Sequence, residues 1–119
     1  MSDPSDFLPL SEPVFHILLA VSDRERHGYA IVKEVGRRTG GRVVLSTGTL
    51  YAAIKRLLAD GLIDRAEGRA DPELDDARRR YYALTALGKR VVKMETDRLS
   101  DLVQMALDKQ MTPGFAAGE

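Results

Sequence analysis

Apolar positions recur at helical spacing in four stretches of the chain, and the clearest of these covers residues 46–61. Four of its side chains fall at i, i+4, i+7 and i+8 and so form one buried stripe: Leu50, Ile54, Leu57 and Leu58. Ser46 or Thr47 offers a side-chain oxygen to the free N–H groups of the first turn. Gly61 lies where a left-handed residue closes a helix. The pattern therefore predicts one helix with defined ends.

The opposite face of this helix carries very small side chains and two cations. Its members are Gly48, Ala52, Lys55, Arg56 and Ala59, flanked by Thr49 and Tyr51. Small side chains let a helix sink into a groove of DNA, while lysine and arginine neutralise phosphates. An ordinary surface helix with a solvated polar face shows the same pattern. This helix alone does not distinguish the two interpretations.

Two further helices are predicted before this one. The first follows Leu10, is capped by Ser11 and runs to residue 21. A charged turn over 22–26 leads to the second helix over 27–41, which a glycine pair ends. Residues 42–45 are apolar and predict one brief strand.

A hairpin and a long helix follow the central helix. The strands are predicted over 62–66 and 78–84, with a polar turn over 67–77 between them. Thr85 caps a final helix that ends near residue 110. Two helices joined by a tight turn and followed by a hairpin describe a winged helix-turn-helix, so the predicted fold is mainly α with a small β-hairpin. The expected segments are a flexible arm over 1–9, a winged helix domain over 10–84, the C-terminal helix over 85–110 and a flexible tail over 111–119.

The final helix predicts a dimer. At roughly 25 residues, or about 37 Å, it is longer than the core behind it. Surplus apolar surface on such a helix usually pairs with another chain, although a partly exposed single helix is the simpler explanation. Glu95 and Arg98 fall within the apolar face by helical angle, so we expect them to pair across the dimer contact or to line a polar gap. The apolar face comprises Val91, Met94, Leu99, Leu102, Val103, Met105 and Ala106.

Composition is that of a globular protein, with 44% hydrophobic and 30% charged residues. No cysteine occurs, which excludes disulfides, zinc fingers and thiol nucleophiles. The acidic N-terminus is not a signal peptide, and no apolar run approaches the roughly 20 residues of a membrane span. We therefore expect a cytoplasmic protein without a membrane partner.

Net charge is zero, but it is distributed unevenly along the chain. Residues 24–90 hold 15 Lys/Arg against 9 Asp/Glu, a difference of +6, and the two flanks contribute −4 and −2. A basic centre with acidic ends fits a DNA-facing surface together with a separate association surface.

Enzyme chemistry has little support in the sequence. The two histidines, His16 and His27, have no nearby serine or carboxylate partner that the sequence reveals, and their spacing is not that of a metal site. Gly40-Gly41 is explained as a helix end and not as a phosphate-binding loop. We expect no catalytic residue, no metal and no cofactor.

Four motifs in register resemble the PadR family of bacterial transcriptional regulators. They are His27-Gly28-Tyr29, Thr47-Gly48-Thr49-Leu50-Tyr51, Gly61-Leu62-Ile63 and Arg80-Tyr81-Tyr82-Ala83-Leu84-Thr85-Ala86-Leu87-Gly88. The single short C-terminal helix resembles the smaller subgroup of that family. The resemblance implies a homodimer that binds double-stranded, pseudo-palindromic operator DNA, usually as a repressor. It also implies dimerisation through the last helix together with the first, with Leu10 and Phe15 as expected contacts, and a small hydrophobic effector in some relatives.

The DNA-binding residues expected from these arguments lie on the two helices and the wing. On the helices they are Tyr29, Lys33, Ser46, Thr47, Gly48, Thr49, Tyr51, Ala52, Lys55 and Arg56; on the wing they are Arg65, Arg69, Arg78, Arg79 and Arg80. Thr47, Thr49, Ala52 and Arg56 are expected to read base edges.

The wing tip runs against this interpretation, since it carries Asp71, Glu73, Asp75 and Asp76. Either the tip swings clear of DNA or the wing makes no useful contact. These acids and the zero net charge keep a second hypothesis open, in which the winged helix binds only other proteins.

Overall fold

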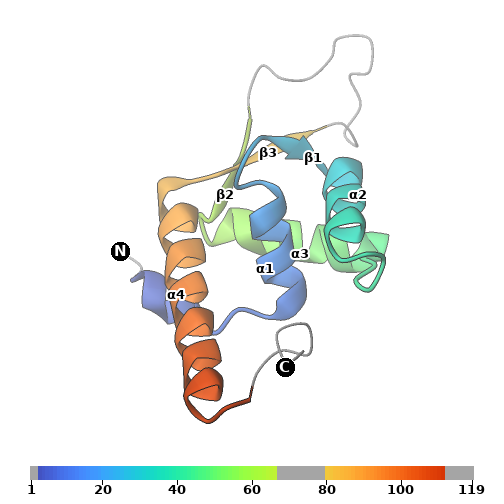
Figure 1. Cartoon of the computed structure of the whole chain (residues 1–119). Coiled ribbons are helices and arrows are strands. Elements are labelled where there is room, and N and C mark those ends of the chain that lie inside the picture. Colours follow the sequence, from blue (N-terminus) through green and yellow to red (C-terminus); the bar gives the residue numbers. More distant parts are fainter. Residues whose placement is uncertain (1–2, 67–79, 112–119) are drawn as a thin grey trace.

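The computed structural model describes residues 3–66 and 80–111. These residues form four α-helices and a small sheet at one end of the helices, with a short 3-10 helix at the beginning (Figure 1). The helices are η1 Pro4–Phe7, α1 Glu12–Ala20, α2 Gly28–Arg38, α3 Thr47–Ala59 and α4 Ala86–Asp108, and the strands are β1 Arg26–His27, β2 Ile63–Arg65 and β3 Tyr81–Leu84. The predicted helices and both strands of the hairpin are present, with ends displaced by up to three residues.

Side-chain caps fix where the helices begin. Ser46 caps α3, because its Oγ accepts the N–H of Thr49 at 3.1 Å. Thr85 does the same for α4. Gly61 closes α3 with a φ of 76°, a left-handed conformation that glycine adopts without strain.

The sheet has three antiparallel strands in the order β1-β3-β2, so β3 is central. The prediction of a bare hairpin omitted β1, where a charged turn was expected. A two-residue strand shows no alternation, so no sequence pattern marks it. Arg26 is held there by the carbonyl of Ala20, to which its Nε donates at 2.7 Å.

The prediction of a strand over residues 42–45 is wrong. Val44 is 78% exposed, and this segment joins no sheet. Thr39 engages it instead: the Thr39 Oγ1 accepts the N–H of Val43 at 3.1 Å, and the Thr39 carbonyl accepts the N–H of Arg42. The segment is a hydrogen-bonded connection that positions the start of α3.

The core lies where α1, α2 and α3 meet the sheet and the first turns of α4. Its most deeply buried apolar side chains are Ile17, Leu18, Ile31, Leu62, Ile63 and Val91, and α3 adds Leu50, Ile54 and Leu57. Because α3 buries one face in this core, the helix presents its other face to solvent.

The N-terminal segment, which was expected to be a flexible arm, contains a short helix. Asp3 and Asp6 form a capping box around η1, which packs against α4. The N–H of Leu10 then donates to Glu95 on α4 at 2.9 Å. Residues 3–10 therefore attach α4 to the beginning of α1.

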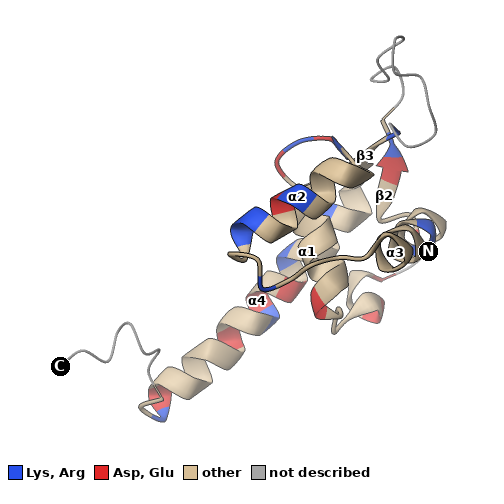
Figure 2. Ribbon diagram, turned by 90° about the vertical axis from the view of Figure 1, so that its right-hand side faces the viewer, with Lys and Arg blue, Asp and Glu red and all other residues tan. Residues whose placement is uncertain are grey.

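The distal part of α4 extends away from the other helices (Figure 2). From residue 100 to residue 109 every position except Ala106 is exposed. In the part of the chain that the structure describes, no helix is both long and apolar enough to cross a membrane.

Candidate nucleic-acid interface

The solvent face of α3 carries the side chains that the sequence assigned to DNA. Arg56 is 82% exposed, and Lys55, Gly48 and Ala52 are exposed beside it. Ser46, Thr47, Thr49 and Tyr51 are exposed along the first turns. Neither cation is covered by another element, so the face is free to approach a groove.

A cleft of about 490 Å³ separates α3 from the base of the wing. Its lining is Tyr51, Ile54, Lys55, Leu58, Arg65, Arg80 and Tyr82. Four of these were predicted DNA-binding residues, and the fold brings them together from α3, from β2 and from the residue before β3. The floor is apolar, while three cations and two phenols surround it.

Tyr82 is the cleft residue that the sequence analysis omitted. It pairs with Arg65 across β2 and β3, so the two side chains are neighbours on one face of the sheet. Arg80 is two residues away along the chain, which places it on that same face. The alternation of Arg80 with Tyr82 was visible in the sequence and would have identified this residue.

Burial raises the pKa of the Tyr82 phenol, an effect that Arg65 and Arg80 partly oppose. The hydroxyl therefore stays protonated at neutral pH, when it is able to donate a hydrogen bond. A protonated phenol among cations suits an anionic acceptor such as a phosphate oxygen.

The beginning of α2 forms a second exposed aromatic site. Tyr29 is 64% exposed, and the Lys33 ammonium lies 5.3 Å from the centre of its ring. The His27 ring stacks beside Tyr29, and the His27 Nδ1 accepts the N–H of Ala30. This cap gives His27 a structural role at the beginning of α2.

Gly28 joins the two aromatic sites. A methyl group at this position would lie 2.6 Å from the Tyr51 hydroxyl. Tyr51 therefore packs across the beginning of α2, which explains why a glycine precedes Tyr29. The contact fixes α2 against α3.

Arg69, Arg78 and Arg79 lie outside the described residues, as do the four acids of the wing tip. Arg65 and Arg80 are the wing cations that the structure places, and both are exposed at the base of the wing.

The predicted dimer residues divide into three groups. Met94, Leu102 and Val103 are exposed at 37%, 48% and 55%, and Leu10, Phe15, Arg98, Leu99 and Ala106 are partly buried. Val91 and Glu95 are buried inside the single chain, so they are not available to a second copy. Glu95 pairs with Arg98 on its own helix and not across a contact between chains. These hydrogen bonds from Arg98 are the main reason that the pKa of Glu95 is lowered.

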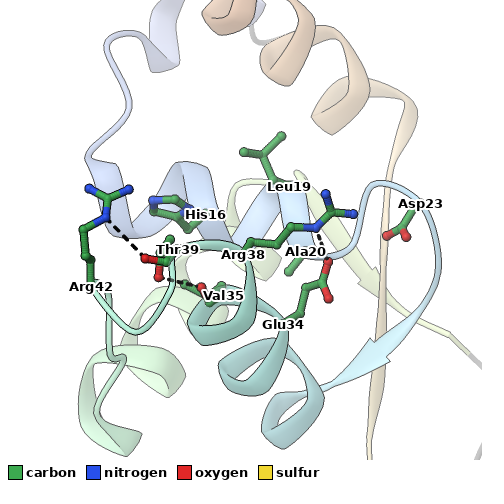
Figure 3. A pocket seen from close by; sticks show the side chains of 9 residues that line it. All are labelled: His16, Leu19, Ala20, Asp23, Glu34, Val35, Arg38, Thr39 and Arg42. Carbon is green, nitrogen blue, oxygen red and sulfur yellow. Dashed lines mark hydrogen bonds and ion pairs between the residues drawn. The ribbon is translucent and has the colours of Figure 1, made fainter. Parts of the chain in front are cut away.

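A separate pocket of about 380 Å³ lies between α1 and α2 (Figure 3). Leu19, Ala20 and Val35 form its apolar part, and His16, Arg38 and Arg42 border it. Hydrogen bonds from Arg37 and Arg38 hold the pKa of the Glu34 carboxyl, which also lines it, below its ordinary value.

Comparison with known proteins identifies the class of this fold. The model of the PadR-like family of transcriptional regulators matches residues 17–94, more than half of the chain. The chain belongs to the PadR-like family. It is similar to the transcriptional regulator Rv3488 of Mycobacterium tuberculosis, with 37% identity over 95 residues that cover 80% of this chain and 82% of that protein. An uncharacterised protein X of Lysinibacillus sphaericus is 34% identical over 73 residues, which cover 61% of this chain and 64% of that one.

Solved structures of transcriptional regulators agree with the fold. A transcriptional regulator from Clostridium thermocellum is 26% identical with a TM-score of 0.66, covering 83% of this chain and 89% of that one. A PadR family regulator from Clostridium difficile is 24% identical with the same TM-score of 0.66, covering 84% of this chain and 99% of that one.

The PadR-like assignment confirms the resemblance, the winged helix fold and the class of transcriptional regulators, as opposed to enzymes. Winged helix proteins of this class act on DNA. The part played by each exposed side chain in this chain remains a prediction.

Proposed function

We propose that this PadR-like chain is a homodimeric repressor that binds a pseudo-palindromic operator through α3 and the base of the wing. The observation that carries the proposal is the cleft in which Tyr51, Lys55, Arg65 and Arg80 meet. Residues distant in the sequence converge there on a single cationic surface.

The cleft holds a backbone phosphate in this proposal. Lys55 on α3 and the two wing arginines supply the positive charge, and the phenols of Tyr51 and Tyr82 supply neutral donors. Contacts of this kind fix the register of a helix on the duplex without reading sequence. Tyr29 and Lys33, at the beginning of α2, contact a second stretch of backbone.

Sequence is read by the exposed face of α3. Thr47, Thr49 and Ala52 offer hydroxyl and methyl groups to base edges, and Arg56 offers a bidentate donor that suits guanine. Gly48 lets the backbone approach closely, because nothing lies within 4 Å of the position that a side chain would occupy. The first turns of α3 therefore enter the major groove.

Dimerisation uses the distal face of α4. Leu102, Val103 and Met105 are 48%, 55% and 60% exposed within one chain, and apolar surface of this extent is costly in water. A second copy of α4 and the partner's first helix cover it. Two copies of α3 then lie about 34 Å apart, one turn of DNA.

Repression and its release complete the proposal. A dimer seated across a promoter blocks transcription, and a small hydrophobic effector that changes the angle between the long helices lowers DNA affinity. The resemblance to PadR regulators supports this step, and the pocket between α1 and α2 is a candidate place for the effector. A panel of small molecules, scored for release of operator DNA, tests it.

The decisive experiment selects DNA from a randomised pool with the purified protein. We expect enrichment of an inverted repeat, protection of two half-sites in footprinting, and repression of a reporter placed behind the selected site. Enrichment of no sequence, together with a salt slope near zero, would favour a protein-binding winged helix instead. A monomer at working concentration would refute the dimer.

A further inference from the structure

The beginning of α4 is attached directly to the end of α3. The Thr85 hydroxyl donates to the carbonyl of Gly61 at 2.6 Å, and the Thr85 N–H donates to the carbonyl of Leu62 at 3.1 Å. Gly88 then lies so close that a methyl group there would overlap the Leu62 carbonyl oxygen. The first turn of α4 is thus fixed to the residues that follow the DNA-facing helix.

A second attachment lies two turns further along α4. Glu95 is 1% exposed, and its carboxylate accepts the N–H of Leu10 at 2.9 Å and two hydrogen bonds from Arg98. Leu10 immediately precedes Ser11, the cap of α1. The middle of α4 is thus fixed to the beginning of α1.

Two points of attachment fix the direction of the α4 axis, whereas a single point would let the helix pivot. Gly88 and Glu95 are seven residues apart, about 10 Å along the helix axis. Beyond them, residues 100–109 are almost entirely exposed within the chain, so the protomer does nothing more to orient that end. The angle between α4 and α3 therefore depends on this second attachment together with the packing of η1 and α1 against α4.

A carboxylate at this place needs an explanation other than stability. Burying a charge is expensive even when it is paired, and an apolar side chain would fill the space at lower cost. A carboxylate differs from an apolar group in accepting directional hydrogen bonds, here from a backbone N–H on another element. Those bonds specify one arrangement of the two elements and exclude sliding.

We propose that Glu95 is a positioning residue: it fixes the angle of α4 relative to α3, and it thereby sets the half-site spacing that the dimer accepts. The proposal rests on the dimeric DNA-binding function proposed above. Arg98 supports Glu95 in this role, because it neutralises the carboxylate charge. The Arg98 side chain is 37% exposed on the α4 surface that is proposed to meet the second copy.

The first test measures the angle without DNA. The chain has no cysteine, so cysteines introduced at the exposed positions Arg24 and Lys109 carry two spin labels, one on each part of the protomer. Labelled chain diluted in unlabelled chain reports the distance within one protomer. We expect a narrow distance distribution in the parent and a broad one in Glu95→Gln, because an amide NH2 group there replaces one of the two carboxylate oxygens that accept from Leu10 and Arg98.

The second test measures spacing on DNA. A series of operators carries one base pair more or fewer between the half-sites, which moves one half-site by about 3.4 Å and about 35° around the axis. We expect the parent to lose affinity on the order of tenfold or more at each step, because the DNA must deform to restore register. Glu95→Gln should bind the series nearly evenly, with unchanged affinity for an isolated half-site.

Asp97→Asn is the matched control, because it removes the same charge from an exposed position of the same helix. It should behave like the parent in both tests. A narrow distance distribution in Glu95→Gln, or a loss of affinity that is equal at every spacing and at the half-site, would overturn the positioning role. Failure of the parent to bind DNA would refute the proposed function, and the spin-label distances would still decide whether Glu95 fixes α4.

Discussion

Replacing Lys55 and Arg56 with alanine should weaken DNA binding and flatten its dependence on salt. The cations of the proposed interface that the structure places are exposed and number five in each protomer: Lys33, Lys55, Arg56, Arg65 and Arg80. If each cation, including Arg56 at its base edge, displaces one counterion from the duplex, a dimer displaces about ten, and the slope of log K against log salt is about −9. The double substitution removes four contacts from the dimer and should bring the slope to about −5.

These slopes predict a large difference over an accessible salt range. Between 50 and 200 mM salt the parent should lose about 10⁵ in affinity and the variant about 10³. In each protomer the two substitutions should cost on the order of 1–3 kcal/mol of binding free energy. Since both side chains are exposed, the free energy of unfolding should change little.

Fluorescence anisotropy with a labelled operator, measured across a salt series, gives both the slope and the affinity. The matched control replaces Lys89 and Arg90, an adjacent cationic pair that is exposed on α4 and outside the cleft. Its salt slope should equal that of the parent. A slope that is unchanged in the α3 variant, or equally reduced in the α4 variant, would show that α3 does not lie on the phosphates.

Three further predictions concern stability and fit. Gly88→Ala should destabilise the fold by about 2–4 kcal/mol in urea unfolding, because the new methyl overlaps the Leu62 carbonyl, whereas Gly36→Ala should stabilise it by up to about 1 kcal/mol, since nothing lies within 4 Å. Gly48→Ala has the same open space in the free protein, so it should leave the fold intact and yet lower operator affinity, because a methyl inserted at a close contact costs about 1–3 kcal/mol. The folded-state pKa of Glu95 lies below its unfolded value near 4.3, so its stabilising contribution is complete above about pH 5 and is lost as the pH falls through the folded-state value. Urea midpoints measured from pH 5 to pH 3 should therefore fall more steeply in the parent than in Glu95→Gln, and parallel curves would contradict this account.

The elements that the sequence predicted well are those whose signals lie close together along the chain. The stripe of α3 and the caps at Ser46 and Thr85 are local features, readable within one or two turns. The sheet was harder, because β1 contributes two residues whose partners, Tyr81 and Tyr82, lie more than fifty positions away. Strand pairing over such a separation is decided by the tertiary fold, so a short stretch of sequence contains no pattern that predicts it.

Glu95 shows a different limit. Its helical angle placed it correctly within the apolar face of α4. The angle does not indicate whether that face is covered by the same chain or by a second copy. The first half of the face is covered by the chain's own N-terminal segment, and the second half is exposed. The arm over residues 1–9 was expected to be flexible, and its described part contains the helix η1. That part is held by a capping box and by one backbone hydrogen bond to a buried carboxylate, which hydrophobic patterns do not report.

Zero net charge does not weigh against DNA binding in this molecule, because charge acts locally in salt. The Debye length is about 8–10 Å at physiological ionic strength, so a phosphate at the cleft responds to Lys55, Arg65 and Arg80 and hardly to acids on distant elements. Two such acids, Asp101 and Asp108, lie on the distal part of α4, which extends away from α3 (Figure 2). Their repulsion of DNA grows as salt is lowered and the screening length approaches about 30 Å. A protein with zero net charge can therefore still attract DNA close to its cationic interface. The same zero net charge reduces long-range attraction to DNA that presents no half-site.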